Sequence, residues 1–510
     1  MDKILVLDFG GQYNELIARR VRSLSVYAEI INYDRITVDE IRNRKYKGII
    51  LTGGPNSVND TNSPHYSKDI LSLHIPILGI CYGHQLLSYL SGGAVSHAER
   101  NSEYGKTTLY TTDSILFDEI PNTITSWMSH TDYVSIVPEG FKVIAKTDNC
   151  EVSAIENKDK LLFGVQFHPE VTHTEYGINI LSNFIFKICK ANPDWKMDDF
   201  IESSIKKYST ELRGEKVLLA LSGGVDSSVL AVLLNKAIGD NLICIFVDHG
   251  LLRKNESDYV YNLFKDKFNL NIIRIDAKTR FLEKLKGVVS PEEKRKIIGK
   301  EFIEVFNDAK KDLGEIKYLS QGTIYPDIIE SGNNSSSVIK SHHNVGGLPK
   351  DTGFKEIIEP LKYLFKDEVR EIGRRLGLPE KIVYRQPFPG PGLAVRIIGE
   401  ITEEKLEIEL EADLILREEF KKHNLEKDAS QYFTVLLNTH SVGVMGDDRT
   451  YGYTVAIRSV TTDDFMTATW TRIPYDVLEI VSSRITNEVK GVNRIVYDIT
   501  SKPPATVEWE

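Results

Sequence analysis

Cysteine is scarce in this sequence, and the few cysteines stand far apart. The 510 residues include only Cys81, Cys150, Cys189 and Cys244, and no two of them form a Cys-x-x-Cys pair. In a chain of this length, that spacing argues against a disulfide framework and gives no sign of a zinc or iron–sulfur site. We therefore expect a cytoplasmic protein with reduced thiols, of which at most one or two are chemically special.

The sequence also lacks an apolar segment long enough to cross a membrane. No uninterrupted run approaches ~18 apolar residues, and Asp8 breaks the run that starts at Ile4. This N-terminal pattern is typical of a buried first strand rather than of a signal peptide. The sequence thus predicts no membrane partner.

An excess of positive charge is missing as well. Lys and Arg number 63 against 73 Asp and Glu, which gives a net charge of −10, while Gly (35) and Pro (18) are close to average usage. An acidic chain is a poor general binder of nucleic acid, so we expect no nucleic-acid partner, although small anionic ligands are compatible with local basic sites. At ~150 residues per domain, the length predicts about three domains.

The first predicted domain, residues 1–190, alternates short apolar segments with helical patterns. Apolar segments that alternate with helices indicate an α/β fold with a largely parallel sheet. The helical patterns cover residues 14–24 and, at the end of the domain, 178–190. The expected strands lie at residues 4–9, 48–53, 76–81 and 162–167.

A second α/β pattern occupies residues 191–385. Its apolar runs predict strands in a parallel sheet that is covered on both faces. Residues 331–353 are rich in Ser, Asn and Gly and predict a mobile loop. The proline-rich stretch 385–396 is not expected to form regular structure, and we set the second domain boundary there.

Residues 386–510 predict a smaller α+β domain. A charge-dense helix is expected over residues 402–423, with a solvated face and apolar residues on the other side. Strands are expected at 431–437, 453–460 and 494–500, with a helix at 476–489 before the last strand. The predicted fold class is therefore α/β, with two parallel-sheet domains followed by a smaller α+β domain.

The sharpest local signal in the first domain is Gly79-Ile80-Cys81-Tyr82-Gly83. A predicted strand runs directly into a predicted helix, with Cys81 at the turn, as in a nucleophile elbow that carries a thiol. The flanking glycines would permit a strained turn, and the helix N-terminus would favour a thiolate. The competing interpretation is a buried structural cysteine.

A partner for this thiol follows in Phe167-His168-Pro169-Glu170, just after a predicted strand. Residues i and i+2 of an extended segment point to the same side, so Glu170 can orient the imidazole of His168. His168 would act as the base for the thiol. The glycine turn at Gly53-Gly54 can direct backbone N–H groups at a developing oxyanion.

These motifs, GGPNSV, GICYGHQ and GVQFHPEV in that order, resemble the class I glutamine amidotransferases. The resemblance implies that Cys81 attacks the side-chain amide of glutamine, that His168 acts as acid and base, and that Glu170 orients it. Gly54 and Tyr82 would supply the oxyanion N–H groups. The other histidines of this domain (His84, His97, His130 and His173) are interpreted as surface or packing residues.

In the second domain, a loop of small residues lies between a predicted strand and a predicted helix. Such a loop can wrap a phosphate, and the helix dipole adds to the attraction. It lacks the GK[ST] ending of a Walker motif, and Asp226 is a candidate Mg²⁺ ligand. A plain glycine turn is the alternative. The loop consists of Ser222, Gly223, Gly224, Val225, Asp226, Ser227 and Ser228.

The string SGGVDSS resembles the pyrophosphate loop of the ATP pyrophosphatases. That resemblance implies cleavage of ATP between its α and β phosphates, with Mg²⁺, and formation of an adenylate. Joined to an ammonia-producing domain, it implies amidation at an activated oxygen. Lys366, in FKDEVR, either contacts the pyrophosphate or is an exposed helical lysine.

Further segments extend a resemblance to the glutamine-hydrolysing GMP synthetase family over essentially the whole chain. They include VDHGLLRKNE, QGTIYPDIIES, RQPFPGPGLAVR and SKPPATVEWE; Gly11 and His249 depart from residues common in that family. The resemblance implies glutamine, ATP and xanthosine 5′-monophosphate (XMP) as ligands and a homodimer formed through residues 386–510. It also implies XMP contacts at Arg295, Gln431, Asp447, Lys502 and Glu508. Because ammonia must reach the adenylate before water does, we expect loop 331–353 to order as a lid over it.

Two alternatives remain open at the level of sequence. One keeps both catalytic domains but amidates another acceptor, as in glutamine-dependent NAD synthesis, which usually draws ammonia from a nitrilase-type domain. The other is a non-catalytic binding protein that retains the folds. The presence of Cys81, His168, Glu170 and the SGGVDSS loop argues against the second.

Overall fold

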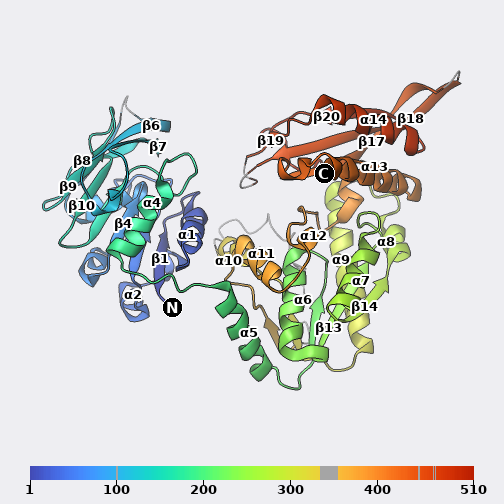
Figure 1. Ribbon diagram of the computed structural model, residues 1–510, viewed down its shortest axis with the longest axis horizontal. Coiled ribbons are helices and arrows are strands. Elements are labelled where there is room, and N and C mark those ends of the chain that lie inside the picture. The colour runs from blue at the N-terminus through green and yellow to red at the C-terminus, as the bar shows by residue number, and fades with distance from the viewer. Residues whose placement is uncertain (99–101, 333–353, 446–447, 463–464, 466) are drawn as a thin grey trace. The chain divides into compact units, whose positions relative to one another are not determined.

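The computed structural model describes residues 1–98, 102–332, 354–445, 448–462, 465 and 467–510. The chain divides into two compact units, Met1–Phe200 and Ile201–Glu510, each with its own hydrophobic core. The units are distinguished by colour in Figure 1, from blue to teal and from green to red. Within the described ranges, no helix combines the length and the apolar character that crossing a membrane requires.

The described part of the first unit is built on a nine-stranded sheet with the order β2-β1-β3-β4-β11-β10-β9-β6-β7. The strands from β2 to β11 run parallel to their neighbours, so the four predicted strands and their parallel pairing are confirmed. Their segments are almost wholly apolar because this part of the sheet is buried. These strands are β1 (Lys3–Asp8), β2 (Tyr27–Asn32), β3 (Gly48–Leu51), β4 (Ile77–Ile80) and β11 (Leu162–Val165).

The other half of this sheet is antiparallel and was not expected from the sequence. β6 alternates buried and exposed side chains, which is the pattern of a strand with one solvated face. The sheet is therefore mixed rather than largely parallel. The added strands are β6 (Glu103–Thr111), β7 (Thr123–His130), β9 (Lys142–Lys146) and β10 (Ala154–Asn157), and a separate pair is formed by β5 (Ala94–His97) and β8 (Asp132–Ile136).

Helices complete the first unit. α1 follows β1, as predicted, and α3 follows β4 directly. The predicted closing helix is α4, which continues into a π-helical turn at Asn183–Ile188. The helices are α1 (Asn14–Ser23), α2 (Val38–Arg44), α3 (Tyr82–Leu90) and α4 (Gly177–Ser182).

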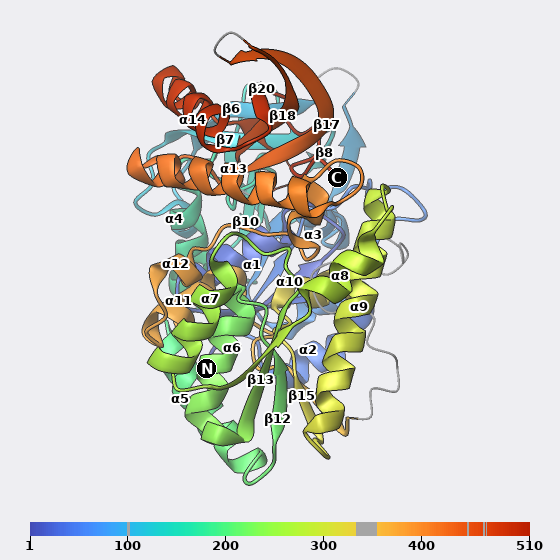
Figure 2. The same ribbon diagram turned by 90° about the vertical axis from the view of Figure 1, so that its right-hand side faces the viewer.

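The second unit begins after α5 (Met197–Glu211) has started, and it contains a parallel five-stranded sheet in its described part. Figure 2 shows α6 and α7 on one side of this sheet and α8 and α9 on the other, as predicted for a sheet with two covered faces. The strands, in the order β14-β13-β12-β15-β16, are β12 (Val217–Ala220), β13 (Leu242–Asp248), β14 (Asn271–Asp276), β15 (Tyr318–Ser320) and β16 (Glu356–Ile358). The helices are α6 (Val225–Ile238), α7 (Glu256–Asn262), α8 (Lys278–Leu285), α9 (Pro291–Asp312), α10 (Tyr325–Gly332), α11 (Lys366–Arg375) and α12 (Glu380–Val383).

The last part of the chain forms a second sheet in the same unit. β17 (Gln431–Met445) pairs antiparallel with β18 (Asp448–Thr461), and β18 pairs parallel with β20 (Val492–Asp498) and antiparallel with β19 (Thr469–Trp470). α13 (Glu403–Lys422) and α14 (Tyr475–Glu488) pack against this sheet (Figure 2). The three predicted strands and both predicted helices are present.

Two expectations for this region need correction. The proline-rich stretch 385–396 is not wholly irregular, because Gly392–Arg396 forms a 3₁₀ helix that buries Leu393 and Arg396. α13 is not simply solvated along its charged face, because Glu409 and Asp413 are buried. Burial and the neighbouring Asp413 raise the pKa of Glu409 well above its usual range.

One continuous core joins the two sheets of the second unit. Buried residues of the parallel sheet, such as Leu218 and Ile245, belong to the same apolar cluster as Phe420, Leu436 and Val455. This shared core does not mark a boundary between residues 385 and 386. The domain limits 1–190, 191–385 and 386–510 stay predictions from the sequence. The predicted mobile loop 331–353 lies outside the described residues except for the end of α10.

Candidate active sites

Cys81 stands at a sharp turn between β4 and α3. Its backbone adopts φ +53° and ψ −109°, a conformation that costs energy for a residue with a side chain. Two backbone hydrogen bonds hold the turn in place. Cys81 N–H donates to Val165 O of β11 at 2.8 Å, and His84 N–H of α3 donates to Cys81 O at 3.0 Å. The thiol is therefore presented at the start of a helix, as the elbow motif predicts.

The glycines on either side of Cys81 have a different role from the one expected. Neither Gly79 nor Gly83 has a positive φ, so neither relieves strain in the turn. A Cβ on Gly79 would collide with the carbonyl of Gly83, and a Cβ on Gly83 would collide with the carbonyl of Leu51 in β3. These glycines let α3 approach the sheet closely, while Cys81 itself takes the unusual conformation.

His168 and Glu170 meet in a buried hydrogen bond. His168 Nδ1 lies 2.7 Å from Glu170 Oε1, and both residues are buried. Burial disfavours the charged imidazolium, yet the Glu170 carboxylate and the Cys81 sulfur raise the pKa of His168 to about 10. His168 is further positioned because Thr174 Oγ1 donates to its carbonyl at 2.6 Å. The ring is thus oriented by the carboxylate and stabilised in its protonated form.

One cavity of about 770 Å³ brings the predicted residues of this domain together. Cys81 and His168 line it, as do Gly53, Gly54 and Tyr82. Gly54 has little room for a side chain, since a Cβ there would lie 2.9 Å from Phe9 O and 3.3 Å from Tyr82 Cγ. The cavity is large enough for an amino-acid side chain and backbone.

Two contacts to the Cys81 sulfur come from residues that sequence reasoning missed. Gln166 Nε2 lies 3.8 Å from the sulfur, and the sulfur lies 3.7 Å from Ser129 O. Gln85 Nε2, one turn along α3, donates to Gln166 Oε1 at 3.2 Å and to Asp132 O at 2.8 Å. Gln85 and Gln166 therefore connect the thiol to the cavity wall formed by residues 129–132.

The loop Ser222–Ser228 connects β12 to α6 in the second unit. Gly223 has φ +73°, which a residue with a side chain rarely adopts, and Gly224 caps α6. Ser222 Oγ and Ser227 Oγ lie 3.0 Å apart. The backbone of the loop thus turns tightly at a helix N-terminus, which is a favourable arrangement for an anion.

Asp226 in this loop forms an ion pair with Lys366 at the start of α11. Lys366 Nζ lies 2.6 Å from Asp226 Oδ2, so Lys366 is directed at the loop rather than only at solvent. Asp226 Oδ1 is buried and has no hydrogen-bond partner among the described residues. A carboxylate oxygen left without a partner beside a phosphate loop fits a Mg²⁺ ligand.

A buried arginine organises the predicted nucleotide site of the second unit. Arg396, fully buried at the end of the 3₁₀ helix, donates to Glu508 Oε1 and Oε2 at 2.9 and 3.2 Å. Gln431 Nε2 donates to the same Glu508 Oε1 at 2.7 Å. The structure thus brings Gln431 and Glu508 together, and it adds Arg396, which the sequence analysis did not single out.

Other buried cations hold the C-terminal tail in place. Arg458 is fully buried and donates to the carbonyls of Thr500, Thr506 and Val507 at 2.5, 2.8 and 3.3 Å. Lys294 in α9 is also fully buried and donates to Glu510 Oε2 at 2.6 Å. These contacts fix the tail on both sides of Glu508.

Two of the remaining predicted nucleotide contacts, Arg295 and Lys502, form contacts within the described structure. Arg295 contacts the carbonyl of Glu510, beside the Lys294 anchor. Lys502 pairs with Ala468 in an isolated bridge, and its Nζ donates to Phe465 O at 2.5 Å. Asp447 lies outside the described residues.

Comparison with protein-family models divides most of the chain among three families. Residues 5–188 match "Glutamine amidotransferase class-I", residues 197–284 match "PP-loop domain", and residues 418–509 match "GMP synthase C terminal domain". These segments contain the elbow, the phosphate loop and the tail, respectively.

Curated relatives match over nearly the full length. A protein of Acetivibrio thermocellus named "GMP synthase [glutamine-hydrolyzing]" is 61% identical over 508 residues, which cover 99% of each chain. A protein of Clostridium kluyveri with the same name is 59% identical over the same share of each chain. Among solved structures, a glutamine amidotransferase of Thermotoga maritima matches at 18% identity with a TM-score of 0.28, covering 38% of this chain and 86% of that one.

Proposed function

The chain belongs to the glutamine-hydrolysing GMP synthases, and we propose that each of its sites performs one step of glutamine-dependent GMP synthesis. Glutamine is hydrolysed to glutamate and ammonia in the first unit. In the second unit, ATP activates XMP by adenylation, and ammonia replaces AMP to give GMP. The observation that carries the proposal is that Cys81 and His168 line one cavity, while Glu170 binds the imidazole of His168.

In the first reaction, the Cys81 thiolate attacks the side-chain amide carbon of glutamine. The carbonyl oxygen becomes an oxyanion, for which the backbone N–H groups of Gly54 and Tyr82 are the proposed donors. Imidazolium His168 then donates its proton to the departing nitrogen, and the C–N bond breaks to release ammonia. The resulting thioester is hydrolysed by water, whose proton His168 accepts. The C–S bond then breaks, which regenerates the Cys81 thiolate beside the imidazolium and yields glutamate, whose carboxyl proton passes to solvent.

The charge state of His168 supports this role. The raised pKa of His168 keeps the imidazolium available beside the Cys81 sulfur, and the thiolate is the nucleophilic form of a cysteine. Glu170 is a positioning residue, because it contacts the imidazole of His168 and is not among the residues that line the cavity. Gln166 is positioned to orient the sulfur.

In the second reaction, the C2 oxygen of XMP attacks the α-phosphorus of ATP, and the bond to pyrophosphate breaks. The loop Ser222–Ser228 is the proposed cradle for the departing pyrophosphate, because its N–H groups and the α6 dipole favour an anion there. Lys366 supplies a cation beside that cradle. Ammonia then attacks C2 and AMP leaves with the bonding electrons.

We propose Mg²⁺ as the metal that accompanies ATP, with Asp226 as its protein ligand. The fit rests on Asp226 Oδ1, whose buried oxygen lacks a described partner. When bound, the ion would neutralise phosphate charge. Lys366 Nζ contacts Asp226 Oδ2, and phosphate oxygens of bound ATP would compete for this cation.

The proposed XMP site is formed by the residues around the tail. Arg295 and Lys502 provide positive charge suited to a 5′-phosphate, while Gln431 and Glu508 offer amide and carboxylate groups to the base or ribose. Asp447 completes the set by family resemblance. Because Arg396 and Gln431 both bind Glu508, the carboxylate is held in one orientation before the nucleotide arrives.

We propose a homodimer formed through residues 386–510. The outer part of the β17–β18 pair supports this assignment, because Val442, Val444 and Tyr451 are among its exposed apolar side chains. Exposed apolar residues that lie on neighbouring strands are suited to a subunit interface. Sedimentation equilibrium of the purified chain would test it, and a monomer at all concentrations would refute it.

The decisive experiment supplies the protein with XMP, MgATP and glutamine and follows the products. GMP, AMP, pyrophosphate and glutamate are expected in equal amounts. ADP and phosphate in place of AMP and pyrophosphate would contradict adenylation, and turnover of another acceptor in place of XMP would favour the alternative substrate. No turnover by a folded protein would favour the non-catalytic alternative.

The division of labour has its own test in Cys81→Ala. This variant should lose glutamine-driven synthesis and retain synthesis from added ammonium, because the adenylation site is in the other unit. Cys189→Ala is a matched control, since Cys189 is a buried thiol of the same unit outside the cavity lining. Loss of both activities in a folded Cys81→Ala protein would contradict the assignment.

A further inference from the structure

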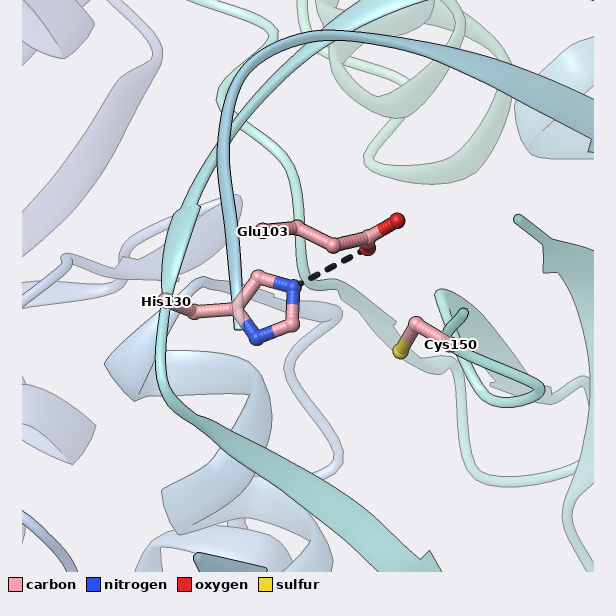
Figure 3. A group of neighbouring side chains, drawn as sticks. All are labelled: Glu103, His130 and Cys150. Atoms are coloured by element: carbon pink, nitrogen blue, oxygen red, sulfur yellow. Dashed lines mark hydrogen bonds and ion pairs between the residues drawn. The ribbon is translucent and has the colours of Figure 1, made fainter. Parts of the chain in front are cut away.

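A second cysteine of the first unit lies in a buried cluster with a histidine and a glutamate. Glu103 begins β6, His130 ends β7, and the two residues are directly paired in the sheet. Cys150 lies in the loop after β9. All three are buried, and one ligand atom from each lies within 4.8 Å of the others. Figure 3 shows the Cys150 side chain beside the imidazole of His130 and the carboxylate of Glu103, with its sulfur on the imidazole side.

The tautomer of His130 is fixed by its surroundings. Nδ1 lies 3.0 Å from the carbonyl oxygen of Asp132, and a carbonyl only accepts, so Nδ1 carries a proton. The other nitrogen, Nε2, lies 3.3 Å from Glu103 Oε2. In the neutral ring, the Nε2 lone pair therefore points toward a carboxylate oxygen, an arrangement that a cation between them would stabilise.

The distance between His130 Nε2 and Glu103 Oε2 is compatible with a long hydrogen bond and also with two ligands of one metal ion. A charge-assisted N–H···O bond to a carboxylate is normally about 2.7–2.9 Å long, which is shorter than the 3.3 Å found here. Two ligands bound at about 2.0–2.1 Å to a tetrahedral zinc ion stand about 3.3–3.4 Å apart. The His130–Glu103 spacing thus fits an edge of a zinc coordination tetrahedron.

The groups around the cluster resemble the supports of a metal site. Ligating histidines usually donate their second N–H to a carbonyl, as His130 does to Asp132, and ligating carboxylates are usually hydrogen-bonded. Thr147 Oγ1 donates to Glu103 Oε1 at 2.8 Å and accepts from Cys150 N–H at 2.9 Å. Thr147 therefore connects the carboxylate and the cysteine backbone.

We propose that Glu103, His130 and Cys150 bind one Zn²⁺ ion, through Oε2, Nε2 and Sγ. One sulfur, one nitrogen and one oxygen ligand suit zinc better than magnesium or calcium, which prefer oxygen alone. Binding releases the Cys150 thiol proton to solvent and moves the sulfur toward the other ligands by up to about 1 Å, since zinc–sulfur bonds are about 2.3 Å long. The fourth position is left to water.

The site would act on the wall of the glutamine cavity without taking part in the reaction. His130 is also a lining residue of that cavity, next to Ser129, whose carbonyl contacts the Cys81 sulfur. Zinc would hold the end of β7 against β6 at this point. The proposal stands on the geometry of the three residues and does not depend on the reaction assigned to Cys81.

The test uses the full-length chain carrying Cys81→Ser, so that the cavity thiol cannot bind the probe. After incubation with ZnCl₂ and removal of free metal, we expect one zinc per chain by elemental analysis. Adding Cys150→Ser should weaken zinc binding by at least about tenfold, whereas adding Cys189→Ser should leave it unchanged. Circular dichroism of each variant checks that the chain is folded.

Substitution of zinc by cobalt(II) tests independently whether the Cys150 sulfur binds the metal. The Co²⁺ complex of the Cys81→Ser chain should show a thiolate-to-cobalt charge-transfer band, and this band should be absent from the Cys81→Ser/Cys150→Ser chain. Less than one zinc in the Cys81→Ser chain would overturn the proposal. Equal zinc binding with and without Cys150 would overturn it too, and the cluster would then be a buried Glu103–His130 ion pair.

Discussion

His168 Nδ1 lies 2.7 Å from Glu170 Oε1 in a pair that is almost completely removed from solvent. The carboxylate raises the pKa of the imidazole against the effect of burial. Glu170, only two positions away, thus sets both the orientation and the charge of His168, the proposed proton donor to the departing nitrogen.

Replacing Glu170 with Gln should lower the pH above which glutaminase activity is lost, which we call the alkaline limit. In the unaltered chain, His168 keeps its proton up to a pKa of about 10; without the carboxylate, burial still favours the neutral ring and the pKa falls. We also expect kcat to fall by roughly 10²-fold or more. The measurement is the pH profile of glutamine hydrolysis from pH 6 to pH 10.5 in steps of about half a unit.

Glu139→Gln, at an exposed position of the same unit, is the control for the loss of one negative charge. Its profile should match that of the unaltered chain. If the alkaline limit of Glu170→Gln stayed where it is, Glu170 would not be the group that controls His168.

Gly83→Ala should destabilise the protein and impair the glutaminase together. The new Cβ would meet the Leu51 carbonyl, so α3 must shift away from β3 and carry Cys81 with it. Overpacking of this kind typically costs about 1–3 kcal/mol. Denaturant unfolding and glutamine hydrolysis measure the two effects.

Gly299→Ala is the matched comparison, because Gly299 is also a helical glycine. It lies in α9, is exposed, and a Cβ there would meet nothing within 4 Å. Alanine should therefore stabilise the helix by about 0.5–1 kcal/mol. Equal unfolding free energies for the two variants would contradict the packing role of Gly83.

Arg458→Met should weaken XMP binding while leaving glutamine hydrolysis intact. Arg458 holds three tail carbonyls, and each hydrogen bond to a charged group contributes about 1.5–3 kcal/mol. We expect the KM for XMP, measured with ammonium as the nitrogen source, to rise by about tenfold or more. Arg494→Met, at an exposed position of β20, should not change it; an unchanged KM in Arg458→Met would remove the tail from the XMP site.

His249→Asn should reduce the acid sensitivity of the fold. Burial lowers the pKa of His249 to about 4, against about 6.5 in an unfolded chain. Between these values the unfolded chain binds a proton that the folded chain does not, so the free energy of unfolding falls as pH falls, by at most about 1.4 kcal/mol per pH unit. Asparagine can still accept the hydrogen bond from Leu251 N–H, which Nδ1 now accepts at 3.0 Å.

Unfolding curves between pH 4 and pH 7 test this expectation in steps of about half a unit. The His249→Asn curve of stability against pH should be flatter than that of the unaltered chain. His440→Asn, at an exposed position, should leave the slope unchanged. Parallel curves for His249→Asn and the unaltered chain would show that His249 does not carry the pH dependence.

Local patterns in the sequence predict the parallel strands and the residues of the elbow. β1, β3, β4 and β11 are continuous apolar runs because both faces of the parallel region are covered. β6 was missed because Lys106, Thr107 and Thr108 interrupt its apolar residues, so no continuous apolar run marks it, and it is held by pairing with β7 and β9. β6 forms because it pairs with β7 and β9, and a short window of sequence does not identify these partners.

Candidate site residues could be predicted where they lie together in a short sequence motif. They could not be predicted where only tertiary contacts bring them together. Cys81 lies within the motif GICYGHQ, and His168 and Glu170 lie within the motif FHPE. Arg396 and Arg458 were missed because arginine is usually exposed, and only the fold buries them. Glu103, His130 and Cys150 lie on separate segments, so no sequence spacing marks them as a group.

The shared carboxylate of Glu508 has an evolutionary consequence. Because Arg396 and Gln431 both donate to it, loss of Glu508 would leave two buried donors without this partner, which is costly, whereas loss of either donor leaves Glu508 bound to the other. Substitutions at these positions should therefore be strongly epistatic, and their combined effects will differ from the sum of the single effects. A lineage that alters this part of the protein is expected to change the three residues as a set.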